Sequence, residues 1–217
     1  MPWVQMLLAG ALMGGIMTPA FFRLKAAGKK GPSLAVKGGC TLVAAILGLV
    51  GAFHHGEAAA WGCFAGLVVC AGADIAIGIN FMAGVALFFL GHGVYIAAFT
   101  QAVEPTGWIL AVFLLLLSIL FGLFRTWHDA IGSERRIPFL IYAVMLCLMC
   151  AFAVPMLWQR EGVSGWFVAL GALLFALSDG LLLRNLLFGS TLRQEQISLS
   201  IYYAGQWLLG AAWLFGG

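Results

Sequence analysis

The chain has 217 residues, of which 63% are hydrophobic and only 9% are charged, whereas a soluble domain usually carries about a quarter charged residues. So little polar surface excludes a water-exposed globular enzyme and indicates an integral membrane protein. The net charge of +3 gives no reason to expect a nucleic-acid partner, because the few basic residues fall between apolar segments.

Eight apolar segments follow one another along the chain, separated by charged residues, proline or glycine. Each has roughly the 20 residues that a helix needs to cross the hydrocarbon core, and a segment in lipid must be helical to satisfy its own backbone hydrogen bonds. We therefore predict an all-α polytopic bundle of eight transmembrane helices, forming a single domain over residues 1–217. The predicted spans are residues 3–22, 34–53, 58–77, 81–102, 106–125, 137–157, 163–187 and 198–215.

The basic residues are distributed unevenly across this topology. All the lysines and arginines except Arg160 fall on one side of the membrane if there are eight spans. Because basic loops tend to remain in the cytoplasm, we expect both termini to face outward and the protein to lie in the plasma membrane, which is the inner membrane of a bacterium. The residues on the basic side are Arg23, Lys25, Lys29, Lys30, Lys37, Arg125, Arg135, Arg136, Arg184 and Arg193.

Two aspartates, Asp74 and Asp179, lie within predicted spans. A carboxylate in hydrocarbon costs at least a few kcal/mol, so each is expected to face a partner, the bundle interior or a watery cavity. Each lies about 24 Å along its span from the outer end, at one depth in the cytoplasmic half. They are separated by about half the chain, as two parallel four-helix repeats would require. Equal depth favours a functional pair, although each aspartate alone is also compatible with a structural hydrogen bond between helices.

Polar side chains also mark the fourth span of each half. His92 and Tyr95 lie on one face of their helix, as do Tyr203 and Gln206, because residues three apart are neighbours on a helix surface. These residues are candidates for a site shared with the aspartates, although tyrosine and glutamine also join helices by hydrogen bonds. The full set is His92, Tyr95, Tyr202, Tyr203 and Gln206.

The stretch AGADIAIGINFMAGVALFFLGHGVYIAAF resembles the YhhN-type lysoplasmalogenase family, whose pattern contains an aspartate, a Phe-x-x-Gly and a His-x-x-Tyr. Later segments resemble the family's Phe-x-x-Ser-Asp and Tyr-Tyr-x-x-Gln elements, and one lysine takes the place of a family Lys-Pro. The matching residues are Lys37, Asp74, Phe81, Gly84, His92, Tyr95, Phe175, Ser178, Asp179, Tyr202, Tyr203 and Gln206.

This resemblance implies hydrolysis of the vinyl-ether bond of a lysoplasmalogen to a fatty aldehyde and a glycerophospho-ethanolamine or -choline, with Asp74 and Asp179 as the catalytic pair. Such a bond breaks by protonation of carbon followed by addition of water, and paired carboxylates assist a related cation in glycosidases. The expected partners are the lysophospholipid, water and membrane lipids, with no metal and no cofactor. Residues expected to bind or orient the substrate are Lys37, Asn80, His92, Tyr95, Ser178, Arg184, Tyr202, Tyr203 and Gln206.

Other functions remain open at this point. Lys37 and Arg184 are expected near the cytoplasmic interface, where such residues either snorkel or contact a lipid phosphate. An aspartate pair also suits a proton-coupled transporter of lipids or small molecules, or an intramembrane aspartyl protease, although Ala73 breaks the Gly-x-Gly-Asp pattern of the latter. A zinc hydrolase is disfavoured because the histidines are scattered along the chain. A non-enzymatic binding role also fits.

Overall fold

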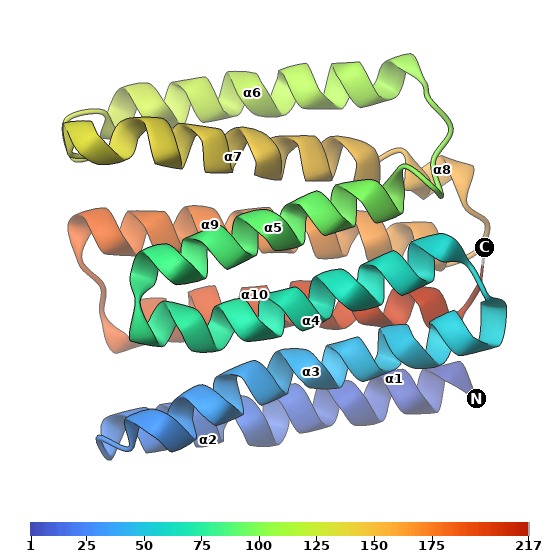
Figure 1. Cartoon of the computed structure of the whole chain (residues 1–217), viewed down its shortest axis with the longest axis horizontal. Coiled ribbons are helices and arrows are strands. Elements are labelled where there is room, and N and C mark those ends of the chain that lie inside the picture. Colours follow the sequence, from blue (N-terminus) through green and yellow to red (C-terminus); the bar gives the residue numbers. More distant parts are fainter. Residues whose placement is uncertain (217) are drawn as a thin grey trace.

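The structure, a computed structural model, describes residues 1–216, and within that range its regular elements are all helices. The long helices lie side by side and run from one end of the bundle to the other (Figure 1). This arrangement confirms the predicted all-α polytopic bundle. The elements are α1 (Pro2–Gly10), the π-helical η1 (Ala11–Met17), α2 (Thr18–Ala26), α3 (Lys30–His55), α4 (Ala58–Ile79), α5 (Phe81–Phe99), α6 (Gly107–Trp127), α7 (Ser133–Ala153), α8 (Met156–Gln159), α9 (Ser164–Phe188), α10 (Leu192–Ala211) and the 3₁₀ turn η2 (Ala212–Leu214).

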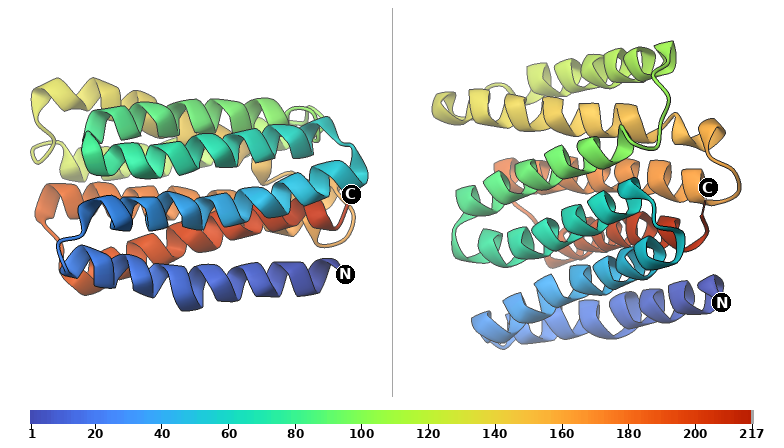
Figure 2. Two further views of the ribbon diagram at one scale, coloured as in Figure 1. Left: turned by 60° about the horizontal axis from the view of Figure 1, so that its bottom comes forward. Right: turned by 45° about the vertical axis from the view of Figure 1, so that its right-hand side comes forward.

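Within residues 1–216, seven helices are long and apolar enough to cross a membrane, counting α1, η1 and α2 as one continuous helix, and α7 with α8 as another. The eighth, α10, has 20 residues but begins with a polar stretch. It packs against α9 and α3, and Tyr202, Tyr203 and Gln206 on it are buried. Neighbouring helices therefore shield these three polar side chains from lipid. Both termini lie at the same end of the bundle (Figures 1 and 2), as an even number of crossings requires.

The last helix differs most from its predicted span, because it begins at Leu192 and not at residue 198. Thr191 and Gln194 form a capping box, in which each side chain binds the backbone of the other. This motif satisfies free N–H groups at the start of a helix, so α10 extends into a polar segment that hydropathy alone does not assign to a span.

The connections α2–α3, α4–α5, α6–α7 and α9–α10 all lie at the end of the bundle opposite the two termini (Figure 1). We call this the basic end, because the lysines and arginines of these connections gather there. At the other end Arg160 is paired with Glu57, with Nη1 2.9 Å from Oε2. The charge asymmetry predicted from the sequence thus corresponds to the two ends of the bundle, while the membrane side on which each end lies stays a prediction.

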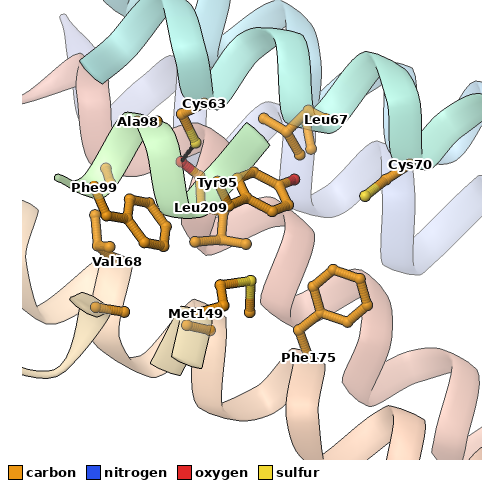
Figure 3. Packing of buried hydrophobic residues seen from close by; sticks show 14 of the residues in the cluster. Cys63, Leu67, Cys70, Tyr95, Ala98, Phe99, Met149, Val168, Phe175 and Leu209 are labelled. Atoms are coloured by element: carbon orange, nitrogen blue, oxygen red, sulfur yellow. Dashed lines mark hydrogen bonds between the residues drawn. The ribbon is translucent and has the colours of Figure 1, made fainter. Parts of the chain in front are cut away.

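Small residues let the inner helices approach closely. A Cβ added at Gly205 of α10 would lie 2.9 Å from the carbonyl oxygen of Gly171 on α9, so only glycine fits this crossing, as is common where membrane helices touch. Larger side chains fill the centre, where Tyr95, Phe175 and Leu209 meet from three helices (Figure 3). The resulting core fixes α4, α5, α9 and α10 against one another.

The outermost helix, α6, has no buried residue and packs against α7. In each half of the chain the first helix therefore lies at an edge of the bundle (Figure 1). Two parallel repeats would produce this order, and the repeat itself stays a prediction. The inner helices α4 and α9, which carry the intramembrane aspartates, lie away from both edges.

Candidate active site

An open cavity of about 400 Å³ is lined by residues of α2, α3, α4, α5, α9 and α10 in the half of the bundle nearer the basic end. Asp74 lines it from α4 and Asp179 lines it from α9. Two aspartates from opposite halves of the chain thus meet at one cavity. Its volume lies in the range typical of small-molecule sites.

Asp74 is 1% exposed and has three hydrogen-bond or ionic partners. Its Oδ1 lies 3.4 Å from Nζ of Lys37. Its Oδ2 accepts hydrogen bonds from the hydroxyls of Thr41 and Tyr202, the latter at 2.9 Å. Lys37 and Thr41 are four residues apart on α3 and so lie on one face of that helix. One cation and two hydroxyl donors together offset much of the cost of burying an ionised carboxylate.

Asp179 has a sparser environment. It is half-buried, and its Oδ2 accepts a hydrogen bond from the hydroxyl of Tyr142 on α7. Within residues 1–216 no lysine or arginine is within ion-pair distance of it, and its Oδ1 has no hydrogen-bond donor from the protein. One carboxylate of the pair is therefore paired with a cation, while the other has an open oxygen. Such asymmetry suits a pair in which one group remains ionised and the other exchanges a proton with a bound molecule.

Three further residues predicted from the sequence also line the cavity: Lys37, Ser178 and Tyr202. Tyr202 reaches Asp74 from α10, so the closing Tyr-Tyr element does join the aspartate site. The hydroxyl of Ser178 donates to the carbonyl of Phe175 at 2.7 Å within α9.

Six predicted residues do not line the cavity. Two have local structural partners: Asn80 caps α5 by accepting from the backbone N–H of Ala83 at 3.1 Å, and Arg184 donates to Asn185 at 3.3 Å. The others lie behind the site, and their orienting roles stay predictions. The six are Asn80, His92, Tyr95, Arg184, Tyr203 and Gln206.

The residues behind the site do contact members of it. The Tyr203 hydroxyl donates to the backbone carbonyl of Lys37 at 3.2 Å. The His92 ring is fully buried and packs edge-on against the Tyr142 ring, with centroids 5.2 Å apart. Tyr95 donates to Gln206 at 3.0 Å deeper in the core. Tyr203 and His92 thus contact Lys37 and Tyr142, which are partners of the aspartates, whereas Tyr95 and Gln206 bond to each other.

Sequence reasoning missed Thr41 and Tyr142, two of the three hydroxyl donors to the aspartates. The sequence could have connected Thr41 with Lys37, because Thr41 follows Lys37 by about one helical turn and lies on the same helix face. Tyr142 is a single phenol in an apolar span, and nothing local connects it with Asp179. Its identification requires knowing that α7 packs against α9.

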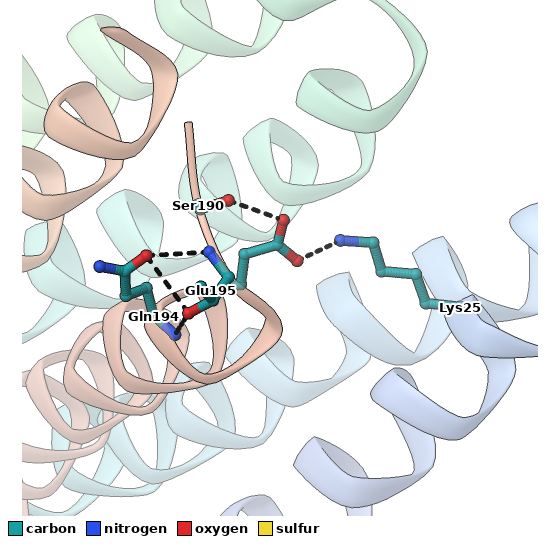
Figure 4. A network of polar contacts seen from close by, with 5 residues as sticks. Lys25, Ser190, Gln194 and Glu195 are labelled. Atoms are coloured by element: carbon teal, nitrogen blue, oxygen red, sulfur yellow. Dashed lines mark hydrogen bonds and ion pairs between the residues drawn. The ribbon is translucent and has the colours of Figure 1, made fainter. Parts of the chain in front are cut away.

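A second polar network lies where the cavity meets the basic end (Figure 4). Nζ of Lys25 lies 2.6 Å from Oε2 of Glu195, and the Ser190 hydroxyl donates to Oε1 of Glu195 at 3.1 Å. The hydrogen bond from Lys25 holds the pKa of the Glu195 carboxyl below its usual value. All three residues line the same cavity as the aspartates, and sequence reasoning assigned a site role to none of them.

Among the residues that the structure describes, no group of three or more His, Cys, Asp or Glu side chains is arranged to hold a metal ion. The polar groups at and around the two aspartates are two carboxylates, a lysine and three hydroxyls, contributed by Asp74, Asp179, Lys37, Thr41, Tyr142 and Tyr202.

Comparison with known proteins gives one result. No curated protein and no solved structure matches the chain. The sequence profile of the YhhN family matches residues 33–213, a stretch that includes both aspartates and their hydroxyl donors. Because the match covers most of the 217 residues, this chain belongs to the YhhN family.

Proposed function

We propose that the protein is a lysoplasmalogenase-like membrane hydrolase, which cleaves the vinyl-ether bond of a lysoplasmalogen to a fatty aldehyde and a glycerophospho-ethanolamine or -choline. The observation that carries this proposal is that Asp74 and Asp179 line one cavity with unequal partners. Membership of the YhhN family supports it, since the sequence motifs resemble lysoplasmalogenases of that type.

In the proposed first step Asp179 acts as the general acid. Its open Oδ1 carries a proton and transfers it to the vinyl carbon remote from the ether oxygen. The carbon–carbon double bond supplies the electron pair for the new C–H bond, which leaves an oxocarbenium ion on the adjacent carbon. The hydrogen bond from Tyr142 to Oδ2 stabilises the carboxylate that remains. Proton transfer by a positioned side chain typically contributes about 10²–10⁴-fold to a rate.

The fixed negative charge of Asp74 then stabilises the oxocarbenium ion, in the way that carboxylates stabilise the related cation of glycosidases. Water adds to the cationic carbon and gives its proton to the Asp179 carboxylate, which restores the acid. The resulting hemiacetal collapses to the aldehyde and the free glycerol hydroxyl. Lys37 stays paired with Asp74 throughout, so the catalytic groups return to their starting charge.

The apolar part of the cavity lining suits the single alkenyl chain of a lysoplasmalogen. Leu182 and Leu186 line the cavity from α9 and are 40% and 42% exposed on the bundle surface. In a bilayer these side chains would contact lipid. We therefore propose that the alkenyl chain lies along this side, with its reactive end between the aspartates and its headgroup towards the basic end. By the positive-inside rule that end faces the cytoplasm.

The test is aldehyde release by the purified protein from three lysolipids that share one chain and headgroup but carry a vinyl-ether, an acyl or an alkyl linkage. The proposal predicts aldehyde from the vinyl-ether lipid alone. Release of fatty acid from the acyl lipid would instead make the protein a lysophospholipase. Movement of intact lipid across proteoliposomes without any product would favour the proton-coupled transporter.

A further inference from the structure

We infer that Lys25 and Glu195 form a headgroup site for a zwitterionic lysolipid, in which Lys25 binds the phosphate and Glu195 binds the ammonium. The inference deepens the proposed function and rests on it, because it assumes that the lipid lies in the aspartate cavity. The family match begins at residue 33, so Lys25 lies outside it.

The first support is position along the cavity. Lys25 lies in the last turn of α2 and Glu195 in the first turn of α10, both at the basic end, and both line the same cavity as the aspartates. Asp74 lies about 8 Å and Asp179 about 14 Å from the ends of their helices at the basic end. A glycerophosphoethanolamine that extends from a vinyl ether between the aspartates towards this end follows the cavity on whose wall Lys25 and Glu195 lie. Its charged groups would then reach Lys25 and Glu195.

The second support is the chemistry of the pair. The side chains of Lys25 and Glu195 are 51% and 37% exposed, and ion pairs this accessible contribute little to stability. The pair can therefore open without loss of the fold. A headgroup with one phosphate and one ammonium replaces one internal ion pair with two ion pairs to the lipid, and the net charge is unchanged. A phosphate without an ammonium would leave Glu195 unpaired beside an anion, which disfavours that ligand.

The third support is that other candidate cations are engaged or distant. Among the described residues the cationic side chains lining the cavity are Lys25 and Lys37. Lys37 lies against Asp74 and is only 16% exposed, and Arg184 does not line the cavity. Lys25 is thus the cation that a phosphate at the mouth would meet. Ser190, whose hydroxyl donates to Glu195 at 3.1 Å, holds the carboxylate beside it.

The experiment measures binding of two non-cleavable lipids to the purified protein in detergent. The probes are a 1-O-alkyl-glycerophosphoethanolamine and the matching 1-O-alkyl-glycerol-3-phosphate, which lacks the ammonium. We expect Glu195→Gln to weaken binding of the ethanolamine lipid about fivefold and to leave binding of the phosphate lipid unchanged or tighter. Lys25→Gln should weaken binding of both lipids about fivefold.

Matched controls remove the same charges from the basic end outside the cavity. Glu134→Gln and Lys29→Gln change exposed residues that do not line it, and neither should alter the ratio of the two affinities. Equal effects of Glu195→Gln on both lipids, or an effect of Glu134→Gln as large, would overturn the headgroup site. Because the probes are not cleaved, absence of aldehyde release from a vinyl-ether lipid would reject the proposed reaction without touching this result.

Discussion

Asp74 lies on the first helix of the hairpin α4–α5 and Asp179 on the first helix of the hairpin α9–α10, yet their neighbours give them different surroundings. The helix beside α4 is α3, which supplies Lys37 and a hydroxyl to Asp74. The helix beside α9 is α7, which supplies only the phenol of Tyr142 to Asp179. Under the proposed mechanism, the comparison teaches that the packing partner, more than the aspartate or its depth, would decide which carboxylate stays ionised and which holds a transferable proton.

The largest expected effect comes from removing the proton donor. Asp179→Asn should lower the rate of aldehyde release at least about 10³-fold, because an amide cannot protonate the vinyl carbon. The measurement is single-turnover release from a vinyl-ether lysolipid. Asp129→Asn, at an exposed aspartate outside the helices, is the matched control and should be fully active. Retention of most activity by Asp179→Asn would refute its role as the acid.

Substitution of the two aspartates should affect the stability of the protein differently, as well as its activity. Asp74→Asn leaves the partly buried ammonium of Lys37 without its counter-ion, so we expect a loss of about 2 kcal/mol in the free energy of unfolding. Asp179→Asn leaves no cation unpaired and should be close to neutral. Thermal unfolding in detergent measures the difference.

A double substitution separates these two consequences. Lys37→Met with Asp74→Asn removes both charges, so the melting temperature should return towards that of the native protein while aldehyde release stays low. Full recovery of activity in the double variant would show that the fixed charge of Asp74 is dispensable. An unchanged melting temperature in Asp74→Asn alone would contradict the importance of its ion pair.

The donor to Asp179 should be the next most sensitive group. Tyr142→Phe keeps the ring that packs on His92 but removes the hydrogen bond that stabilises the carboxylate left after proton transfer. We expect kcat to fall about tenfold, equivalent to one hydrogen bond of about 1.4 kcal/mol, with KM unchanged. A rise in KM at constant kcat would instead place Tyr142 in substrate binding.

How much of this site can be predicted from the sequence depends on whether the relevant residues lie in one segment or on separate helices. The helices and the importance of Asp74 and Asp179 are local signals, since hydropathy and an acid within an apolar run lie in one segment. The residues that contact these aspartates lie on other helices, far from them in the sequence. The sequence leaves Lys37 either as a snorkelling residue or as a lipid-phosphate contact, whereas its ammonium lies against Asp74. The roles of Thr41 and Tyr142 as donors follow from the packing of α3 on α4 and of α7 on α9.

The smallest effect should come from removing one hydroxyl donor to Asp74, which has more polar partners than Asp179. Thr41→Val is nearly isosteric and removes one of two hydroxyls on Asp74, while Lys37 and Tyr202 remain. We expect at most about a threefold fall in kcat, less than for Tyr142→Phe, because the loss of one hydrogen bond of several is partly compensated. Side-by-side kinetics of the two variants measures this order directly. A larger loss in Thr41→Val would reverse the comparison and make Asp74 the carboxylate whose proton affinity limits the reaction.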